Sequence, residues 1–560
     1  MSANERAAAN TTGNFMNRHP FRALCTGLLS AALLLLSAMP LSAQNYPFPR
    51  HVSYPGASIY PNHRTQAQQD ADVRAYYDAW KQSYLVSAGT APDGTALWRV
   101  SMGGSNPGRT TSEGQGYGMK IVVFMAGYDA NAQTIFNGLW KFARLHPSSI
   151  NSNLMAWQVP EGTGNDSAFD GDADIAYALL LAHKQWGSAG TVNYQSAAAT
   201  LIGAIKASTI GPQSRLPMLG DWVSVNGTLR NQYTPRTSDF MLANFRAFGA
   251  ATTDATWSTV VTNSQAAINH LQTTYSSTPG LLPDFTEKTA VDDTNPKPAR
   301  ANFLEGPYDG MYSYNAARVP WRLGIDALLS NDATTLAQVR KISTWAESVT
   351  SGNPQMFKEP GYTLAGAPIN SSWGFSGKFG APLGVAAMTK STQQQWLNAL
   401  YSAVYNRHEG YYSDSITMLS LIIMTGNHWD YSTQAPDLTP PAVNITYPAD
   451  ESTVTGDVAS VYGTASDAAS GVQRVEIDFY RRLPGGGPDD WEFWNGSYWH
   501  WSDPPLSTTL NTSTTPNTWT RTGGLPTGAN FPAAQYWIKA VAFDNAGNAS
   551  TPLYIDFMKQ

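Results

Sequence analysis

The chain of 560 residues has a single cysteine, Cys25, and only 14% charged residues. The shortage of thiols excludes a disulfide framework, iron–sulfur clusters and cysteine-type zinc sites. No basic stripe is present, so nucleic acid is not an expected partner. The sequence also lacks a G-x-S-x-G, H-E-x-x-H, phosphate-loop or dinucleotide-binding motif in its required context, and its nine histidines form no ligand pattern. We expect no metal and no cofactor.

The chain also lacks an apolar run of the roughly 20 residues that a membrane-spanning helix needs. The N-terminal segment "MNRHPFRALCTGLLSAALLLLSAMPLSAQN" holds two arginines, a short apolar stretch over 28–39 and small residues before Ala43. This pattern predicts a signal peptide over 1–43 and an exported bacterial protein, extracellular or periplasmic, with no membrane anchor. Cleavage would remove three of 35 basic and one of 41 acidic residues, which leaves 32 and 40 and a formal charge of −8.

Aromatic residues are plentiful, with 18 Trp and 27 Tyr. A surface poor in charge and rich in aromatic rings suits sugars, whose C–H faces stack on the rings. Large secreted enzymes with many loops have the same composition, so this observation leaves both explanations open. The length favours two domains over one core.

A linker is predicted over 433–441, within the proline-rich stretch "STQAPDLTPPAVNITYP". Before it, over 44–432, "GDADIAYALLLAHKQWG", "YQSAAATLIGAIKAS" and "SDSITMLSLIIMTG" have helical periodicity, the first with one apolar face and the last apolar enough to be buried. After it, over 442–560, "VQRVEIDFYRR" alternates as a strand and "YWIKAVAFDNAGNAS" ends a strand in a turn. Short strands and turns there predict an immunoglobulin-type β-sandwich, and "TASDAASGV" and "AFDNAGN" resemble bacterial Ig-like modules.

Carboxylates beside glycines and aromatics cluster in three places: Glu113 in "TSEGQGYGM", the aspartates of "SAFDGDADIA", and Glu305 with Asp309 in "ANFLEGPYDG". Glycoside hydrolysis needs one protonated and one ionised carboxyl group. Apolar neighbours such as Tyr117 would raise the pKa of Glu113, whereas a helix N-terminus after it would favour the ionised form by about 0.3–1 kcal/mol. Taken singly, each carboxylate is equally explained as a helix cap or first-turn charge.

Together, three ordered motifs resemble glycoside hydrolase family 8, whose members are inverting endo-glycosidases on an all-α (α/α)6 barrel. "SEGQGYGM" is similar to the family's acid motif, which implies that Glu113 is the proton donor. "AFDGDADIAYALLLAHKQW" is similar to the signature A-[ST]-D-[AG]-D-x-x-[IM]-A, which implies that Asp170 contacts the sugar at the cleaved bond. Phe169 departs from the Ser or Thr of that signature, a change expected to reshape the neighbouring subsite.

The third motif, "YNAARVPWR", has Asn315 where many cellulases of the family have the base aspartate. An amide cannot accept a proton from water at neutral pH. One subfamily, which includes chitosanases and chitosanase-glucanases, resembles this chain in its asparagine and takes its base from a glutamate in the preceding loop. The resemblance therefore implies Glu305 as the base, with Asp309 as its nearest rival, about 6.5–9.5 Å from the acid. Arg318 and Arg322 are expected to pair with carboxylates.

Further candidates for substrate contact are mainly aromatic, and each has the hydrophobic core as its alternative place. They are Tyr117, Trp157, Tyr233, Asn315, Trp321, Trp373 and Tyr411. In the C-terminal module, "WEFWNGSYWHW" at 491–501 is either an exposed carbohydrate-binding strip or a hairpin whose aromatics close the sandwich.

The expected function is a secreted, monomeric, inverting endo-β-1,4-glycosidase that hydrolyses chitosan or a β-glucan. The subfamily resemblance and the acidic loops "DFTEK", "AVDDTNP" and "LEGPYDG" favour cationic chitosan, but cellulose and mixed-linkage glucan stay open. A catalytically degenerate polysaccharide-binding protein is the alternative that Asn315 raises. A polysaccharide lyase on a similar barrel would need a Tyr, His or Lys base.

Overall fold

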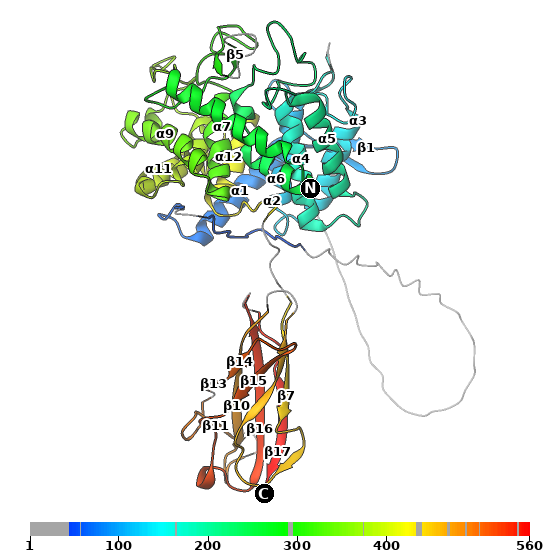
Figure 1. Ribbon diagram of the computed structural model, residues 1–560, viewed down its shortest axis with the longest axis vertical. Helices are drawn as coiled ribbons and strands as arrows, with labels where there is room; N and C mark the ends of the chain where they lie inside the picture. The colour runs from blue at the N-terminus through cyan, green and yellow to red at the C-terminus, as the bar shows by residue number, and fades with distance from the viewer. Residues whose placement is uncertain are drawn as a thin grey trace, which may run out of the picture. The chain divides into compact units, whose positions relative to one another are not determined.

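The computed structural model describes residues 44–560 apart from 56–57, 163–164, 289–294, 373, 433–438, 468–470, 488–489, 503 and 546–547. The predicted signal peptide, Trp373 and most of the predicted linker lie outside the described residues. The described residues form a helical domain and a β-sandwich (Figure 1).

The helical domain is a double ring of α-helices. Six helices form the inner ring, in which each packs against the next and the last closes on the first: α2 Ser112–Phe124, α4 Phe169–Trp186, α6 Leu242–Thr252, α8 Val319–Ser330, α10 Gly377–Ala387 and α12 Tyr411–Met424. Six others lie outside them: α1 Gln66–Tyr84, α3 Ala132–Leu145, α5 Tyr194–Thr209, α7 Thr256–Thr274, α9 Ala333–Val349 and α11 Gln394–Val404. This arrangement confirms the predicted (α/α)6 barrel.

Burial explains which helices are inner and which are outer. In α12 every residue is buried, as its sequence predicted. The prediction of a single apolar face on α4 was incomplete, because nearly all of this helix is buried, including the aspartates of its first turns. The outer helix α3 is amphipathic and buries only one side. Helices at the centre of a barrel contact neighbours all round and therefore lose the one-sided pattern of a surface helix.

Short strand pairs fix the segments that enter the inner helices. The strands β3 Thr110–Thr111 and β4 Gln158–Val159 pair antiparallel, which ties the start of α2 to the segment before α4. Two further pairs join β1 Leu85–Thr90 to β2 Ala96–Val100 and β5 Thr286–Lys288 to β6 Pro296–Pro298. These pairs lie in the connections between the helices, as do Glu305 and Asp309, whereas the other two carboxylate clusters lie in the first turns of α2 and α4.

The C-terminal domain is a sandwich of two sheets, as predicted. One sheet has the order β12-β11-β10-β16-β17-β8, with β13 paired to β10, and the other has the order β14-β15-β9-β7. The strands are β7 Ala442–Tyr447, β8 Ser452–Val454, β9 Val461–Ser466, β10 Val472–Arg482, β11 Trp491–Trp494, β12 Trp499–His500, β13 Leu506–Ser507, β14 Thr509–Asn511, β15 Asn517–Arg521, β16 Ala534–Asp544 and β17 Leu553–Lys559. Alternate residues of β10 and β16 face a core that contains Phe479, Trp519, Ile538 and Phe557. Within the described residues, no helix combines the length and apolarity needed to cross a bilayer.

Candidate active site

Glu113 lies in the first turn of α2, where Thr111 caps the helix by accepting the Gly114 N–H at 3.1 Å. One carboxylate oxygen of Glu113, Oε2, lies 2.7 Å from Arg318 Nη1, and the Tyr411 hydroxyl donates to the other at 3.1 Å. Burial raises the pKa of Glu113 to about 7 against the opposing effect of the Arg318 guanidinium, and the negative charge of Asp170 adds to the increase. A substantial fraction of Glu113 is therefore protonated near neutral pH.

The glycines around Glu113 leave room for the neighbouring helices. A Cβ on Gly114 would lie 2.5 Å from the Tyr411 hydroxyl. A Cβ on Gly116 would lie 2.8 Å from Asp174 Cβ and 3.0 Å from the Gly171 carbonyl oxygen. The glycines thus allow α2 to pack closely against α4 and α12, and they position Glu113 through that packing.

Asp170 lies in the first turn of α4 and is only 2% exposed. Its Oδ2 is 2.7 Å from Arg318 Nη1 and its Oδ1 is 2.8 Å from Arg236 Nη2. Burial raises the pKa of Asp170, but the two guanidinium groups outweigh that effect and hold the pKa well below its usual range. The group therefore stays ionised beside Glu113.

Arg318 is fully buried and joins the carboxylates to one another. Besides Glu113 and Asp170, it donates to Ser238 Oγ at 2.9 Å and to Asn315 Oδ1 at 2.8 Å. A buried guanidinium needs this many acceptors, because each unpaired donor would carry a desolvation cost. Arg322, four residues further on and within α8, makes a two-bond ion pair with Asp174 at 3.0 and 2.7 Å. Both arginines therefore hold carboxylates, as expected.

Asn315 connects this network to Glu305. Because its Oδ1 accepts from Arg318, its Nδ2 must face the other way, and there it donates to Glu305 Oε2 at 2.9 Å. Asn315 is 4% exposed, whereas Glu305 is an exposed residue of the loop before α8. Three successive contacts thus run from Glu113 through Arg318 and Asn315 to Glu305.

Asp309 is 3% exposed and its carboxylate binds the backbone of its own loop. Its Oδ2 accepts the N–H groups of Leu304 and Glu305 at 2.6 and 3.0 Å, and its Oδ1 accepts that of Gly306 at 2.9 Å. These bonds hold the loop in the conformation that places Glu305 against Asn315. Of the two candidates for the base, Glu305 is the one whose carboxylate reaches the network of Glu113.

Two cavities adjoin the network, one at each end. The first, of about 510 Å³, contains Glu305 and Arg236 and has the rings of Trp157 and Trp222 in its wall. The second, of about 620 Å³, is lined by the side chains of Tyr314, Tyr411 and Tyr412. Glu305 thus borders the first cavity directly, whereas Glu113, whose side chain is 19% exposed, is joined to the second through the Tyr411 hydroxyl.

The structure sorts the other predicted contact residues. Trp157 lines the first cavity and Tyr411 the second, but Tyr233 lines neither. Tyr117 and Trp321 are 0% and 1% exposed and pack edge to face at 5.8 Å, so neither ring can stack on a sugar, and their assignment was wrong. Trp373 is outside the described residues.

The residues of the site that were missed in the sequence include Arg236, Trp222, Tyr314 and Tyr412. Tyr314 is 49% exposed and stacks on Tyr412 with ring centroids 4.3 Å apart. Tyr314 precedes Asn315 and Tyr412 follows Tyr411, so adjacency to predicted residues was a usable signal. For Arg236 and Trp222, which lie in long loops, the sequence offered none.

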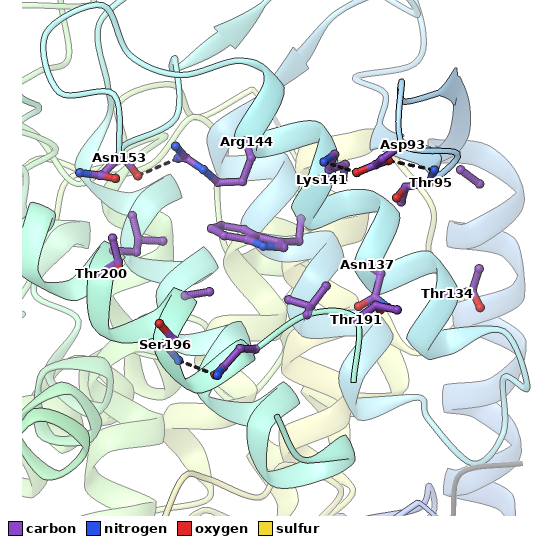
Figure 2. Close-up of a pocket in the computed structure, with 16 residues that line it drawn as sticks. Asp93, Thr95, Thr134, Asn137, Lys141, Arg144, Asn153, Thr191, Ser196 and Thr200 are labelled. Carbon is purple, nitrogen blue, oxygen red and sulfur yellow. Dashed lines mark hydrogen bonds and ion pairs between the residues drawn. The ribbon is translucent and has the colours of Figure 1, made fainter. Parts of the chain in front are cut away.

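A larger cavity, of about 800 Å³, lies away from these residues between α3, α5 and the β1–β2 hairpin (Figure 2). Its single lining carboxylate, Asp93, pairs with Lys141 at 2.5 Å, and Arg144 donates to the backbone oxygens of Ser152 and Asn153. This cavity therefore lacks the two carboxyl groups of a glycosidase. In the part of the chain that the structure describes, no cluster of three or more His, Cys, Asp or Glu residues is arranged to hold a metal ion.

An (α/α)6 barrel with a raised-pKa carboxyl group and a second carboxylate on one arginine network defines a glycosidase-type active site. The chain belongs to glycosyl hydrolases family 8, whose model matches residues 52–426. The model of the bacterial Ig domain matches residues 441–522. Both predicted resemblances are confirmed, and the chain is a glycoside hydrolase, which excludes the lyase.

Similar proteins include a β-glucanase of Niallia circulans, 45% identical over 72% of this chain and 95% of that protein. An endoglucanase of Bacillus sp. (strain KSM-330) is 40% identical over 68% of this chain and 81% of that protein. The apo structure of a β-1,3-1,4-glucanase from Paenibacillus sp. X4 is 46% identical and covers 70% of this chain and all of that one, with a TM-score of 0.65.

Proposed function

We propose that this chain is a secreted endo-β-glucanase that cleaves β-1,4 bonds, with inversion, in an uncharged glucan such as mixed-linkage β-1,3-1,4-glucan. Glu113 is the general acid, Glu305 is the general base, and Asp170 is the ionised partner that keeps Glu113 protonated. The observation that carries the proposal is the chain of contacts from Glu113 through Arg318 and Asn315 to Glu305.

The state of Glu113 supports its role as the acid. The leaving glycosidic oxygen needs a proton as the bond to the anomeric carbon breaks, and a carboxyl group with a pKa of about 7 still carries one near neutral pH. Asp170, fixed as an anion by two arginines, disfavours a second negative charge on Glu113. Both oxygens of Asp170 are engaged, so its direct contact with the sugar stays a prediction.

The position of Glu305 supports its role as the base. Its carboxylate is exposed, borders the first cavity, and is held from one side by the Asn315 amide. In a single displacement, Glu305 takes a proton from a water molecule while the water oxygen forms its bond to the anomeric carbon. At the same time the bond to the leaving oxygen breaks, and that oxygen takes the proton of Glu113.

The charges beside the cavities support an uncharged substrate over chitosan. Of the acidic loop residues that favoured a cationic polymer, Glu287 pairs with Lys297 and Arg300 at 3.1 Å each, and Asp309 binds backbone N–H groups. In the second cavity, Glu359 pairs with Lys378 and Glu409 with Arg407. Glu287, Glu359 and Glu409 are therefore already paired with cations of the protein, and the Asp309 carboxylate is engaged within its own loop. The relatives named above are glucanases, in agreement with this choice.

Asn315 raised the alternative of a degenerate, non-catalytic barrel. The amide of Asn315 has a defined task in the present proposal, because it orients Glu305 and replaces no lost base. The predicted signal peptide over 1–43 supports export of the enzyme to the substrate.

The test compares Glu305→Gln with Asp309→Asn on barley mixed-linkage glucan. We expect Glu305→Gln to lower kcat by about 10²–10⁴-fold with KM nearly unchanged, the range of general base catalysis. Asp309→Asn weakens the loop but keeps the base, so its kcat should stay within about tenfold of the wild type, which is about 1.4 kcal/mol in the barrier.

If Glu305→Gln kept full activity and Asp309→Asn were inactive, Asp309 would be the general base and Glu305 would not. NMR of the first-formed product should show the α-anomer; a β-anomer would refute inversion. Higher turnover on chitosan than on glucan would refute the uncharged substrate.

A further inference from the structure

The β-sandwich has a row of aromatic side chains across three adjacent strands. Tyr480 of β10 lies opposite Phe493 of β11 and Trp537 of β16 in the strand register. Their rings are stacked, with centroids 5.4 Å apart for Tyr480 and Phe493 and 6.2 Å apart for Tyr480 and Trp537, and interplanar angles of 27° and 25°. Trp491, one row further on, meets Trp537 edge to face at 4.8 Å. We call these four residues the aromatic row.

The aromatic row faces away from the core of the sandwich. Successive residues of a strand point to opposite faces. The neighbours Phe479, Trp494, Tyr536 and Ile538 are all buried in the core cluster, whereas the four rings of the row are half-buried and are not packed on that cluster. The row is therefore a surface of this sheet, which has β10, β11 and β16 next to one another (Figure 1).

The two explanations of "WEFWNGSYWHW" each hold for part of it. Trp494 is 3% exposed, and Trp499 stacks on Tyr536 at 5.9 Å, so these two residues close the sandwich. Trp491 and Phe493 belong to the outward row. Trp501, just after β12, is 84% exposed and belongs to neither group.

Two ion pairs lie beside the aromatic row, and one arginine lies against a ring of the row. Lys539 pairs with Asp478 at 2.6 Å and Arg474 with Glu476 at 2.8 Å, while Arg482 lies 4.8 Å from the ring centroid of Trp491. A surface of stacked rings with balanced charge at its margin complements an uncharged polymer and offers no net attraction to a polyanion or a polycation.

We propose that the aromatic row is a binding platform for an uncharged β-glucan chain, separate from the active site. Sugar rings stack through their C–H faces on the rings of the row, and the polar side chains at the margin bind hydroxyl groups. The choice of a glucan rests on the proposed function, since the same chain carries a glucan-cleaving domain. Binding at the platform keeps that domain near its polymer by raising the effective concentration.

The test is affinity electrophoresis of the full chain through gels that contain barley mixed-linkage glucan, run in the cold so that little of the glucan is hydrolysed. Trp491→Ala and Trp537→Ala should each weaken retardation about tenfold, and Trp537→Phe, which keeps a flat ring, should retain most of it. Trp501→Ala is the matched control, an exposed tryptophan of the same region, and should bind like the wild type. Hydrolysis of cellotetraose should be unchanged in all four variants.

Unaltered retardation of Trp491→Ala and Trp537→Ala, with unfolding curves that match the wild type, would overturn the platform. If retardation were lost in Trp501→Ala alone, the aromatic row would not be the binding site. The glucan would then bind at the loop after β12. Stronger retardation by chitosan than by glucan would overturn the uncharged ligand. Retardation does not depend on hydrolysis, so a failure of the proposed catalytic roles would leave this measurement intact.

Discussion

Glu113 and Glu305 are held by two different kinds of structure. Glu113 is in the first turn of an inner barrel helix, and its carboxyl group contacts side chains from α12 and from the segment just before α8. Glu305 is in a loop, is exposed, and has the Asn315 amide as its side-chain partner in the network. The loop itself is held by Asp309 through backbone N–H groups.

The difference matches the chemistry of the roles that we propose for the two groups. An acid must keep its proton at neutral pH, so its environment must be dry and beside a negative charge. A base must reach a water molecule, so its environment must be open and only its direction must be controlled. The comparison therefore predicts that substitutions beside Glu113 change the protonation of its carboxyl group, whereas substitutions beside Glu305 change the position of its carboxylate.

The largest expected effect comes from removing the acid itself. Glu113→Gln should lower kcat on mixed-linkage glucan by about 10⁴-fold, because the leaving alkoxide then departs without a proton. A cellobioside with a dinitrophenyl leaving group needs no proton, so Glu113→Gln should lose much less activity on it. Steady-state kinetics on both substrates measures the contrast.

Glu305→Gln is the matched control for that contrast, because a missing base slows both substrates. Equal losses of Glu113→Gln on the two substrates would show that Glu113 does not donate the proton. If Glu305→Gln regained activity on the substrate with the dinitrophenyl leaving group, Glu305 would be the proton donor. The acid and base roles would then have to be exchanged, and the comparison would fail.

Parts of the fold and site could be predicted because they depend on local patterns. The alternation of "VQRVEIDFYRR" predicted a strand over 472–482, which is β10. The apolar run at the end of the barrel predicted a buried helix, which is α12. Glu305 and Asn315 are ten residues apart in one segment of the chain, so their proximity is also local. The two side chains are hydrogen bonded.

Other parts depend on contacts between distant segments, which a sequence does not display. Arg236 reaches Asp170 from a long loop 66 residues away, and nothing in its neighbours marks it. Trp321 was taken for a sugar contact because an isolated tryptophan gives no sign of its burial, which is 1% exposure here. Asp309 and Glu305 lie in the same loop, and they are distinguished by their contacts, since Asp309 accepts backbone N–H groups and Glu305 accepts from the Asn315 amide.

A smaller effect is expected from Asn315→Ala, which removes the side chain that holds the base and keeps both carboxyl groups. We expect kcat to fall about 10- to 100-fold, corresponding to about 1.4–2.7 kcal/mol in the barrier. Ser238→Ala is the matched control, since Ser238 also accepts from Arg318, at 2.9 Å, but does not touch Glu305. A loss in Ser238→Ala equal to that in Asn315→Ala would mean that both act through Arg318 and that Asn315 does not position Glu305.

The smallest expected effect is a shift of the pH profile in Tyr411→Phe. A general acid works only while protonated, so the alkaline limb of the activity should fall as the pH rises through the Glu113 pKa of about 7. The Tyr411 hydroxyl donates to Glu113 Oε1 at 3.1 Å and favours the ionised form. Its removal should therefore raise the pKa of Glu113 and move the alkaline limb of kcat/KM to higher pH, by one unit or less, since one unit is about 1.4 kcal/mol.

Tyr84→Phe is the control for this shift. The Tyr84 hydroxyl donates to Asp414 at 2.7 Å and does not reach Glu113, so its removal should leave the limb in place. A limb that moves to lower pH in Tyr411→Phe would mean that this hydroxyl supports the protonated acid, and the protonation of Glu113 would then depend on more than burial and Asp170.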